Sequence, residues 1–308
     1  DYVLFRNFLP IIRNSARFKD WHLTLCANVV CKELAHYLDA DHVDDFIWID
    51  VERLKKRRDY FMRVVDLLYR RGFSVAVQPT FSRDIYGDML MQATAAGQRI
   101  GVDGDCMNQN ERQRLVTDSF YTTLIKVHNT PRFEFERNRE IIENIIQQPV
   151  AVKMPSLPRL GKDRPLANAY AVVMPGTSSV FKYWPCLFEI ADYLYFQHGL
   201  EIRLLGKGKR DQRWILDIMK RCKCPAVNLC NQTSLLEAAA VLARAHIVVG
   251  NDSGLIHMAV LLNVPTVCLT AGTHAFRFNH YPENYGFKVR FVFPPELDKK
   301  KGSKAFED

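Results

Sequence analysis

The sequence contains no apolar run that approaches the roughly 20 residues needed to span a bilayer, which excludes a transmembrane helix. It has no P-loop of the G-x-x-x-x-G-K-[ST] form and no G-x-G-x-x-G fingerprint, which excludes two common nucleotide-binding classes. No short-period repeat, low-complexity tract or nucleic-acid motif is present. No signal peptide is visible, but the chain opens at Asp1 without a methionine, so this absence excludes little.

The composition is that of a globular protein, because 48% of the 308 residues are hydrophobic and 25% are charged. This length suits two domains. The formal net charge of +8 favours anionic partners, such as nucleic acid, an anionic membrane surface or phosphorylated substrates. The basic clusters at 55–58, 207–213 and 299–301 each resemble an ordinary solvated surface when taken alone. Without a nucleic-acid motif, we expect no nucleic-acid partner.

Eight cysteines are present, and several lie in apolar strand-like runs, as Cys26 and Cys268 do. Buried, reduced thiols explain this placement best, and they indicate a reducing cytoplasm. Cys222, Cys224 and Cys230 could supply three ligands to zinc. However, the C-x-C spacing is unusual and no fourth ligand stands at a typical distance, so we expect no metal.

Short β-branched apolar runs alternate with longer helical segments along the chain, which predicts βαβ units and parallel sheets. In the first half, the predicted strands are 22–28, 46–49, 74–79 and 98–103, and the predicted helices are 29–38, 53–71 and 84–96. In the second half, the predicted strands are 169–176, 201–206, 226–230, 246–251 and 265–270, and the predicted helices are 185–198, 211–222, 234–244 and 253–262.

Residues 149–168 hold four prolines and little periodicity, and we interpret them as a linker. The sequence therefore predicts two doubly wound, Rossmann-like α/β domains, 1–155 and 165–308, that face each other across a cleft. Ligands of such sheets bind beyond the carboxyl ends of the strands. The first domain opens on a helix with Asp1 as its N-cap, so we expect a strand and its turn to precede Asp1 in the native chain.

The first candidate site runs from Gly250 to His257, where an apolar strand ends and a helix begins near Ser253. Free backbone N–H groups and the positive end of the helix dipole coincide at such a point and can bind an anion. Gly254 would let a phosphate approach the backbone, and His257 could hydrogen-bond the same phosphate. A capped helix whose histidine only packs fits these residues equally well.

The second candidate site, residues 174–185, follows a predicted strand. Gly176, Thr177 and Ser178 form a loop rich in hydroxyl and amide donors, and Lys182 follows closely. Such groups can bind a pyrophosphate without a metal. A plain polar loop between a strand and a helix is the alternative.

The third candidate site, residues 204–214, joins another predicted strand to a turn at Gly206. Asp211 could accept a hydrogen bond from a ribose hydroxyl, as acidic residues do in nucleotide-binding folds. A carboxylate that only stabilises the start of a helix is equally plausible.

Several motifs follow in order along residues 169–282, namely P-G-T-S-S-x-x-K-x-W-P, L-L-G, N-Q-T-S-L-L-E-A-A, V-V-G-N-D-S-G-L-I-H-M-A and V-P-T-V-x-L. Together they resemble glycosyltransferase family 9, the bacterial ADP-heptose:lipopolysaccharide heptosyltransferases, which have the GT-B fold. Their co-occurrence is far more specific than any one motif. The first half resembles the family more loosely, and its segment 133–145 resembles the helix that precedes the family's interdomain crossover.

The resemblance implies that the second domain binds the nucleotide sugar. Thr177, Ser178 and Lys182 stand where the family contacts the donor phosphates. Thr233 stands where backbone groups meet the adenine, and Asp211 lies near the ribose-binding acid. The donor-binding residues implied in this way are Gly176, Thr177, Ser178, Lys182, Gly206, Asp211, Thr233, Asp252, Ser253, Gly254 and His257.

The resemblance also implies the catalytic residues. The family's first strand ends in a G-D pair whose aspartate is the general base, and Asp1 stands at that position. One base and a direct displacement imply inversion at the anomeric carbon. Lys182 would stabilise the departing diphosphate in place of a metal, so the nucleotide-sugar donor is a co-substrate and no cofactor is implied.

The acceptor is less well specified. Residues 271–282 depart from the family's G-P-T-x-P-like turn, so His274, Arg277 and Asn279 could meet a different sugar, although an ordinary surface loop is as plausible. Arg83 and Lys126, together with the basic run 55–58, could contact a lipid-linked or anionic glycan acceptor, or an anionic membrane surface.

The expected function is therefore metal-independent, inverting transfer of heptose from ADP-heptose to a hydroxyl of a lipopolysaccharide-core or related glycan. The expected location is the cytoplasm, peripherally at the inner face of the cytoplasmic membrane. Two alternatives share the fold: a GT-B sugar-nucleotide epimerase that needs no acceptor, and a non-catalytic relative that only binds sugar nucleotides.

Overall fold

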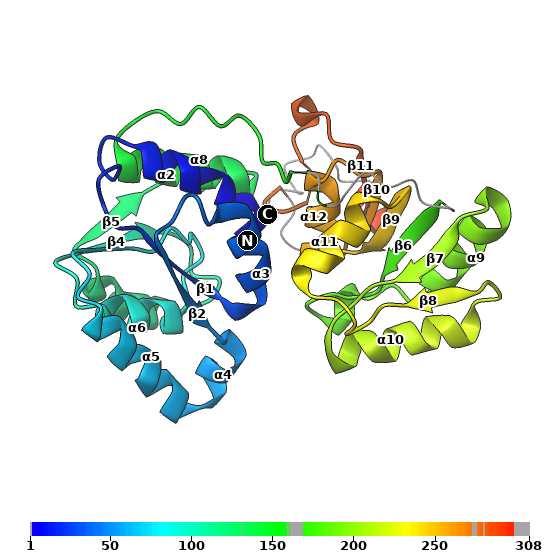
Figure 1. The fold of residues 1–308 in the computed structure, drawn as a ribbon, viewed down its shortest axis with the longest axis horizontal. Helices are drawn as coiled ribbons and strands as arrows, with labels where there is room; N and C mark the ends of the chain where they lie inside the picture. Colours follow the sequence, from blue (N-terminus) through cyan, green and yellow to red (C-terminus); the bar gives the residue numbers. More distant parts are fainter. Residues whose placement is uncertain are drawn as a thin grey trace. The chain divides into compact units, whose positions relative to one another are not determined.

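The computed structural model describes residues 2–130, 132–158, 160, 169–272, 276–279 and 281–298. Apart from its first three residues, the chain divides between Lys153 and Met154 into two compact units, which we call the N-terminal and C-terminal units. Each unit combines parallel strands with helices (Figure 1). Among the described residues, no helix is long and apolar enough to cross a membrane.

The N-terminal unit opens on a helical stretch formed by α1 (Tyr2–Phe5), η1 (Arg6–Phe8) and α2 (Leu9–Asn14). Phe8 packs on Phe135 of helix α8 (Glu134–Ile146), with ring centroids 4.9 Å apart. Figure 1 accordingly shows α2 and α8 side by side. The predicted opening helix and the predicted helix at 133–145 are both confirmed.

The strands of the N-terminal unit form two parallel sheets, one of β1 and β2 and the other of β3, β4 and β5 in that order. The sequence predicted one doubly wound sheet, but β1 and β3 each have only one neighbour among the described strands. Cys26 on β1 is exposed rather than buried, in contrast to Cys268, which is buried as expected. The strands are β1 (Thr24–Asn28), β2 (Asp45–Ile49), β3 (Val75–Val77), β4 (Gln98–Asp103) and β5 (Thr123–Lys126).

The helices of this unit mostly follow the predicted segments, but the segment 53–71 is two helices. Arg57 adopts an extended conformation and ends the first of them, and Asp50 caps its start by accepting a hydrogen bond from the Arg53 N–H. Side chains of β2 and of both helices, such as Ile47, build a buried apolar cluster. The helices are α3 (Lys32–Asp39), which follows η2 (Val29–Cys31), then α4 (Val51–Lys56), α5 (Arg58–Arg70), α6 (Ile85–Ala93) and α7 (Glu111–Thr117), which precedes η3 (Asp118–Phe120).

The C-terminal unit is built on one parallel six-stranded sheet with the order β11-β10-β9-β6-β7-β8. The five predicted strands of this half are confirmed, and β11 at the edge of the sheet was not predicted. The two central strands, β6 and β9, consist almost wholly of buried residues, as expected where helices cover both faces of a parallel sheet. The strands are β6 (Tyr170–Met174), β7 (Glu201–Leu204), β8 (Ala226–Asn228), β9 (Ile247–Asn251), β10 (Thr266–Leu269) and β11 (Val289–Val292).

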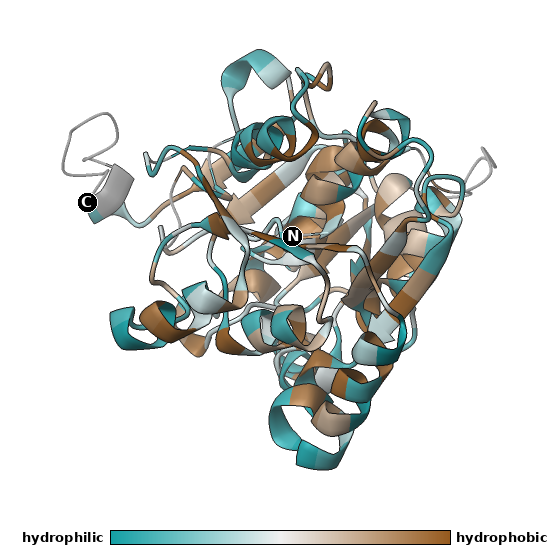
Figure 2. Ribbon diagram, turned by 90° about the vertical axis from the view of Figure 1, so that its left-hand side faces the viewer, coloured by the Kyte–Doolittle hydropathy of each residue, from teal (hydrophilic) through white to brown (hydrophobic). Residues whose placement is uncertain are grey.

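The helices of the C-terminal unit pack apolar faces on this sheet. Leu187 and Ala191 of α9 and Ile215 and Ile218 of α10 are fully buried in one cluster with β6 and β7. Helices α11 and α12 contact each other, and α12 contacts β9 and β10. Elsewhere in the chain, hydrophobic and hydrophilic residues alternate along the helices that face the viewer in Figure 2, as expected when one face of a helix is packed. The helices are η4 (Val180–Lys182), α9 (Leu187–His198), α10 (Gly208–Arg221), α11 (Leu235–Ala243), α12 (Gly254–Leu261), η5 (Glu283–Tyr285) and α13 (Pro295–Asp298).

Candidate functional site

The candidate site lies where the strand order of the C-terminal sheet reverses. From β6 the chain moves outward to β7 and β8, whereas from β9 it moves the opposite way to β10. Because β6 and β9 are parallel neighbours, the loops at their carboxyl ends lie together. Asn251 joins these loops, since its Nδ2 donates to the Pro175 carbonyl at 2.8 Å and its Oδ1 accepts from the Trp184 N–H at 3.2 Å. Such a switch point is where open α/β sheets bind ligands.

Asp252 is the centre of a buried polar cluster at this point. Lys182 Nζ lies 3.9 Å from Asp252 Oδ2, and its side chain is only 11% exposed. His257 Nε2 lies 3.3 Å from Asp252 Oδ1. Asn279 Nδ2 donates to Asp252 Oδ2 at 3.2 Å and to Thr270 Oγ1 at 3.0 Å. The cluster brings together three residues that the sequence proposed for the donor.

The cluster favours an ionised Asp252. Burial by itself raises the pKa of this carboxyl, but the bonds from His257 and Asn279 and the charge of Lys182 outweigh burial and lower the pKa below its ordinary value. An anionic Asp252 repels a phosphate and attracts an ammonium group. Its effect on a bound diphosphate would therefore be indirect, because it holds Lys182 in place.

His257 is held by contacts with other side chains of this region. Its Nδ1 lies 3.0 Å from the Tyr281 hydroxyl and its Nε2 faces Asp252, so both ring nitrogens already have partners. The side chain is buried among aromatic rings, including that of Phe278. This geometry favours a role for His257 in orienting Asp252, and the hydrogen bond from His257 to a phosphate stays a prediction.

The start of α12 is open to a ligand. Ser253 is its N-cap, yet its side chain makes no capping hydrogen bond. At the next residue, a Cβ added to Gly254 would meet no atom of the described residues within 4 Å. Unused backbone N–H groups at the first turn of an eight-residue helix, with free space in front of them, can bind an anion.

The loop after β6 holds a second unused donor. Thr177 is 5% exposed, and its Oγ1 has no hydrogen-bond partner in the part of the chain that the structure describes. Arg210 of α10 fixes this loop by donating to the carbonyls of Thr177 and of the exposed Ser178. Arg210 also lies over the ring of Trp214, 5.3 Å from its centroid. A buried hydroxyl without a partner is costly, which favours a ligand that pairs with it.

Asp211 lies against the same loop. A Cβ at Gly176 would stand only 2.5 Å from Asp211 Oδ2, so glycine is required for this approach. Gly206 is similarly close, because its added Cβ would lie 2.9 Å from the Asp211 Cβ. The Lys207 N–H donates to Asp211 Oδ2 at 3.0 Å. Burial nevertheless raises the pKa of Asp211 above its ordinary value. The second and third candidate segments therefore meet in the fold.

The loop after β8 adjoins these segments. The Asn231 N–H donates to the Gly206 carbonyl at 3.1 Å, and Asn231 Oδ1 accepts from the Gly208 N–H at 2.6 Å. Thr233 follows in this loop and is half-buried, just before Ser234 caps α11. The fold thus gathers the predicted donor residues along the carboxyl edge of β9, β6, β7 and β8.

Residues predicted to meet an acceptor are placed less uniformly. Arg83 is fully buried and pairs with Asp88 at 3.3 Å and with Asp118, so its observed contacts lie in the core of the N-terminal unit and do not favour the predicted contact with an acceptor. Lys126 is exposed at the carboxyl end of β5. Arg277 is half-buried over the Phe278 ring. Asp1 and His274 lie outside the described residues.

Three residues of the site were missed by sequence reasoning, and a fourth was given a different role. Asn251 lies inside the recognised motif and was read only as a helix-capping type. Arg210 lies in a basic cluster interpreted as a solvated surface, and its partners are backbone carbonyls, which leave no sequence signal. Asn279 and Tyr281 belong to a segment where the sequence departs from the family pattern. Asn279 was predicted there to meet a sugar, whereas it donates to Asp252 and Thr270. The role of Tyr281 depends on its contact with His257 of α12, which periodicity does not report.

The lowered pKa of Asp252 gives a stability prediction. Asp252→Asn should destabilise the C-terminal unit by about 2 kcal/mol at pH 7, since it removes charged hydrogen bonds in a buried cluster. Because the pKa of Asp252 is lower in the folded state than its ordinary value of 3.8, ionised Asp252 stabilises the folded state above pH 3.8. This stabilisation is lost as the pH falls through the lower folded-state pKa. The difference in melting temperature between wild type and Asp252→Asn should therefore shrink below about pH 4. Asp217→Asn, on the exposed side of α10, serves as a control. If the difference in melting temperature between wild type and Asp252→Asn stayed unchanged down to about pH 2, that result would contradict an ionised Asp252.

Comparison with known proteins supports one family. The sequence matches glycosyltransferase family 9 (heptosyltransferase) over residues 86–303, more than half of the chain. It is 29% identical over 103 residues to lipooligosaccharide heptosyltransferase 2 of Campylobacter jejuni and 29% identical over 111 residues to lipopolysaccharide heptosyltransferase 3 of Escherichia coli. These alignments cover 32% and 35% of this chain, and they span only 33% of each relative.

Solved structures resemble the whole chain. A family 9 glycosyltransferase from Veillonella parvula superposes with a TM-score of 0.74 at 15% identity, covering 98% of this chain and 85% of that one. An Escherichia coli heptosyltransferase, WaaC, solved with ADP gives 0.71 at 17% identity, covering 96% and 91%. At such low sequence identity these superpositions show the fold alone, and that fold is GT-B. The profile match and the fold together show that this chain belongs to glycosyltransferase family 9.

Proposed function

We propose that the protein is an inverting glycosyltransferase that moves heptose from ADP-heptose to a hydroxyl of a lipopolysaccharide-core or related glycan. One observation carries the proposal: Asp252 holds the Lys182 ammonium beside the open start of α12, at the switch point of the sheet. An ammonium group, free backbone donors and an orphaned threonine hydroxyl within two adjacent loops suit a diphosphate.

The leaving group explains why such a site is needed. As the bond from the anomeric carbon to the diphosphate breaks, negative charge accumulates on the phosphate oxygens. Lys182, the N–H groups at the start of α12 and the hydroxyl of Thr177 are donors fixed in place before the reaction begins. Fixed donors of this kind stabilise developing charge without reorganisation, so the site needs no metal ion for this step.

The other half of the reaction is assigned to the N-terminal unit. The acceptor hydroxyl must lose a proton as it attacks the anomeric carbon, and we assign Asp1 as the general base. One base and one displacement give inversion. Lys126 and Arg277 are kept as candidate acceptor contacts. We place the reaction in the cytoplasm, at the inner face of the cytoplasmic membrane, where a lipid-linked glycan would be reached.

The choice of donor is supported by relatives. Escherichia coli heptosyltransferase WaaC has been solved with ADP and with ADP-2-deoxy-2-fluoro heptose. The curated relatives carry heptosyltransferase names. In this chain, the predicted donor-binding residues lie along the carboxyl edge of β9, β6, β7 and β8. We therefore assign ADP as the carrier and heptose as the sugar.

Calorimetry with a nucleotide panel tests the donor assignment. ADP, UDP and GDP should be titrated separately into the full chain in a buffer with EDTA. We expect ADP to bind most tightly, and to bind equally well with or without EDTA. Tighter binding of UDP or GDP would overturn the choice of ADP, and binding that requires a divalent cation would overturn the metal-independent site.

Asp211 gives a narrower prediction. If its carboxylate accepts a ribose hydroxyl, Asp211→Asn should weaken ADP binding by about tenfold or more, the usual effect of losing a charge-assisted hydrogen bond. Removing the ribose hydroxyl from the ligand should then have little further effect on the variant. The control is Asp217→Asn on the same helix. Equal loss of affinity for the deoxy-ligand in wild type and variant would show that Asp211 does not contact the ribose.

A further inference from the structure

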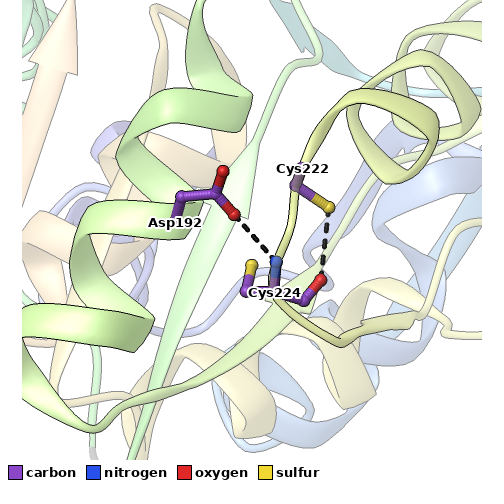
Figure 3. Close-up of side chains that lie close together, drawn as sticks. All are labelled: Asp192, Cys222 and Cys224. Carbon is purple, nitrogen blue, oxygen red and sulfur yellow. Dashed lines mark hydrogen bonds between the residues drawn. The ribbon is translucent and has the colours of Figure 1, made fainter.

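A second cluster of ligand atoms lies away from the donor loops. Asp192 projects from α9, Cys222 follows the end of α10, and Cys224 comes just before β8. The carboxylate oxygen and the two Sγ atoms all lie within 4.8 Å of one another. Figure 3 shows the three side chains around the turn that leads from α10 to β8.

The composition of this cluster differs from the one considered from sequence. The sequence suggested Cys222, Cys224 and Cys230 as three zinc ligands, but Cys230 does not belong to the cluster. The third ligand atom comes instead from Asp192, on the preceding helix. Metal-ligand spacing could not indicate it, because α9 and the α10–β8 turn are brought together only by packing on the sheet.

The distances suit a small thiophilic cation. Tetrahedral zinc has Zn–S bonds near 2.3 Å and Zn–O bonds near 2.1 Å, which place neighbouring ligand atoms roughly 3.5–3.8 Å apart. The observed limit of 4.8 Å therefore requires a contraction of only about 1 Å. Two thiolates and one carboxylate favour zinc over magnesium or calcium, which prefer all-oxygen ligands.

The carboxylate is already oriented for such a role. Asp192 Oδ1 accepts from the Lys223 N–H at 2.7 Å and from the Cys224 N–H at 2.8 Å. Hydrogen bonds of this kind fix a metal-binding carboxylate in place. The other oxygen, Oδ2, takes part in neither bond and can bind a cation. One backbone turn thus positions both the carboxylate and Cys224.

Charge and burial are also compatible with an ion. Two thiolates and a carboxylate around a divalent cation leave one net negative charge, and basic residues are near in the sequence, with Lys220 at the end of α10 and Lys223 in the turn that follows. Cys224 is buried. Cys222 is only half-buried, which leaves room for a water ligand.

We propose that Asp192, Cys222 and Cys224 bind one Zn²⁺ ion, with water as the fourth ligand, and that this ion ties α9 to the turn between α10 and β8. The turn enters β8 at its amino end, whereas the donor loops leave the strands at their carboxyl ends. The proposed zinc site and the donor site therefore lie at opposite ends of the strands of one sheet. The ion is a structural element, and it takes no part in the transfer chemistry.

Cobalt titration of the full chain tests the proposal. The protein is purified with a phosphine reductant, stripped with a chelator and titrated with Co²⁺. We expect the thiolate-to-cobalt charge-transfer band and the visible bands of tetrahedral Co²⁺ to saturate at one equivalent. Zn²⁺ should abolish these bands and raise the melting temperature of the stripped protein by several degrees.

Variants locate the ion. Cys222→Ser should remove most of the charge-transfer absorption, and Asp192→Asn should weaken Co²⁺ binding at least tenfold. Cys230→Ser replaces a buried cysteine of the same apolar cluster and should leave the titration unchanged. Absence of the bands in the wild-type chain would overturn the proposal, as would bands that survive Cys222→Ser. A disulfide between Cys222 and Cys224 under these reducing conditions, seen as a mass lower by two hydrogen atoms, would also overturn it.

Discussion

Lys182→Ala is expected to lower kcat/KM for sugar transfer by about 100-fold or more, the range seen when one fixed donor to a developing negative charge is removed. The reason is its position: Asp252 holds the ammonium 3.9 Å away at the meeting point of the loops after β6 and β9. ADP affinity should fall as well, because the same charge attracts the diphosphate of the ground state. Calorimetry with ADP and steady-state kinetics measure the two effects separately.

The matched control for this variant is Lys288→Ala. Lys288 is an exposed lysine of the same unit, and it lies at the amino end of β11 rather than at the carboxyl edge. Its removal changes the net charge equally and should leave both affinity and turnover within error. If Lys182→Ala bound ADP as tightly as wild type, the phosphate site would have to be placed elsewhere.

Asp1→Asn is expected to reduce turnover by a factor of about 10² to 10⁴, the contribution of a positioned general base. Its effect on ADP affinity should be small, because the residues proposed to bind the donor all belong to the segment 176–257. The two variants therefore separate binding from proton transfer. Lys182→Ala should impair both, and Asp1→Asn should impair only turnover.

Kinetics at saturating donor provide the check for the base. A hydroxyl acceptor cannot attack efficiently while it keeps its proton, so raising the donor concentration should not rescue Asp1→Asn. Asp44→Asn, an exposed carboxylate of the N-terminal unit that pairs with Arg13, is a suitable control for charge removal. Normal turnover by Asp1→Asn would eliminate this residue as the base.

Much of the C-terminal sheet could be predicted from the sequence. Its central strands are buried runs of β-branched residues bounded by glycine and proline, and that pattern marks a parallel sheet. Edge strands were harder. Strand β11 alternates between exposed and more buried residues, and β5 is only four residues long with exposed ends. Neither carries the continuous apolar signal on which the prediction relied.

The position of the candidate site could be predicted from the sequence, but the role of each residue within it could not. The motifs placed Lys182, Asp252 and His257 together because their loops follow strands of one sheet. Which of them would face a ligand depends on side-chain packing. His257 turns inward because Tyr281 and Asp252 occupy both its nitrogens. Arg83 shows the same limit, since the sequence suggested a contact with the acceptor, whereas Arg83 is paired with Asp88 and Asp118 in the core.

Acceptor-dependent release of ADP from ADP-heptose tests the central claim most directly. The full chain is incubated with the donor, with and without a lipopolysaccharide-core acceptor that lacks heptose, and both the nucleotide and the glycan are analysed by mass spectrometry. The proposed function predicts that ADP forms only with the acceptor and that the glycan gains one heptose. Conversion of the donor alone into an isomeric nucleotide sugar would identify an epimerase. Tight donor binding without any turnover, across a panel of acceptors, would identify a binding protein and contradict the transferase.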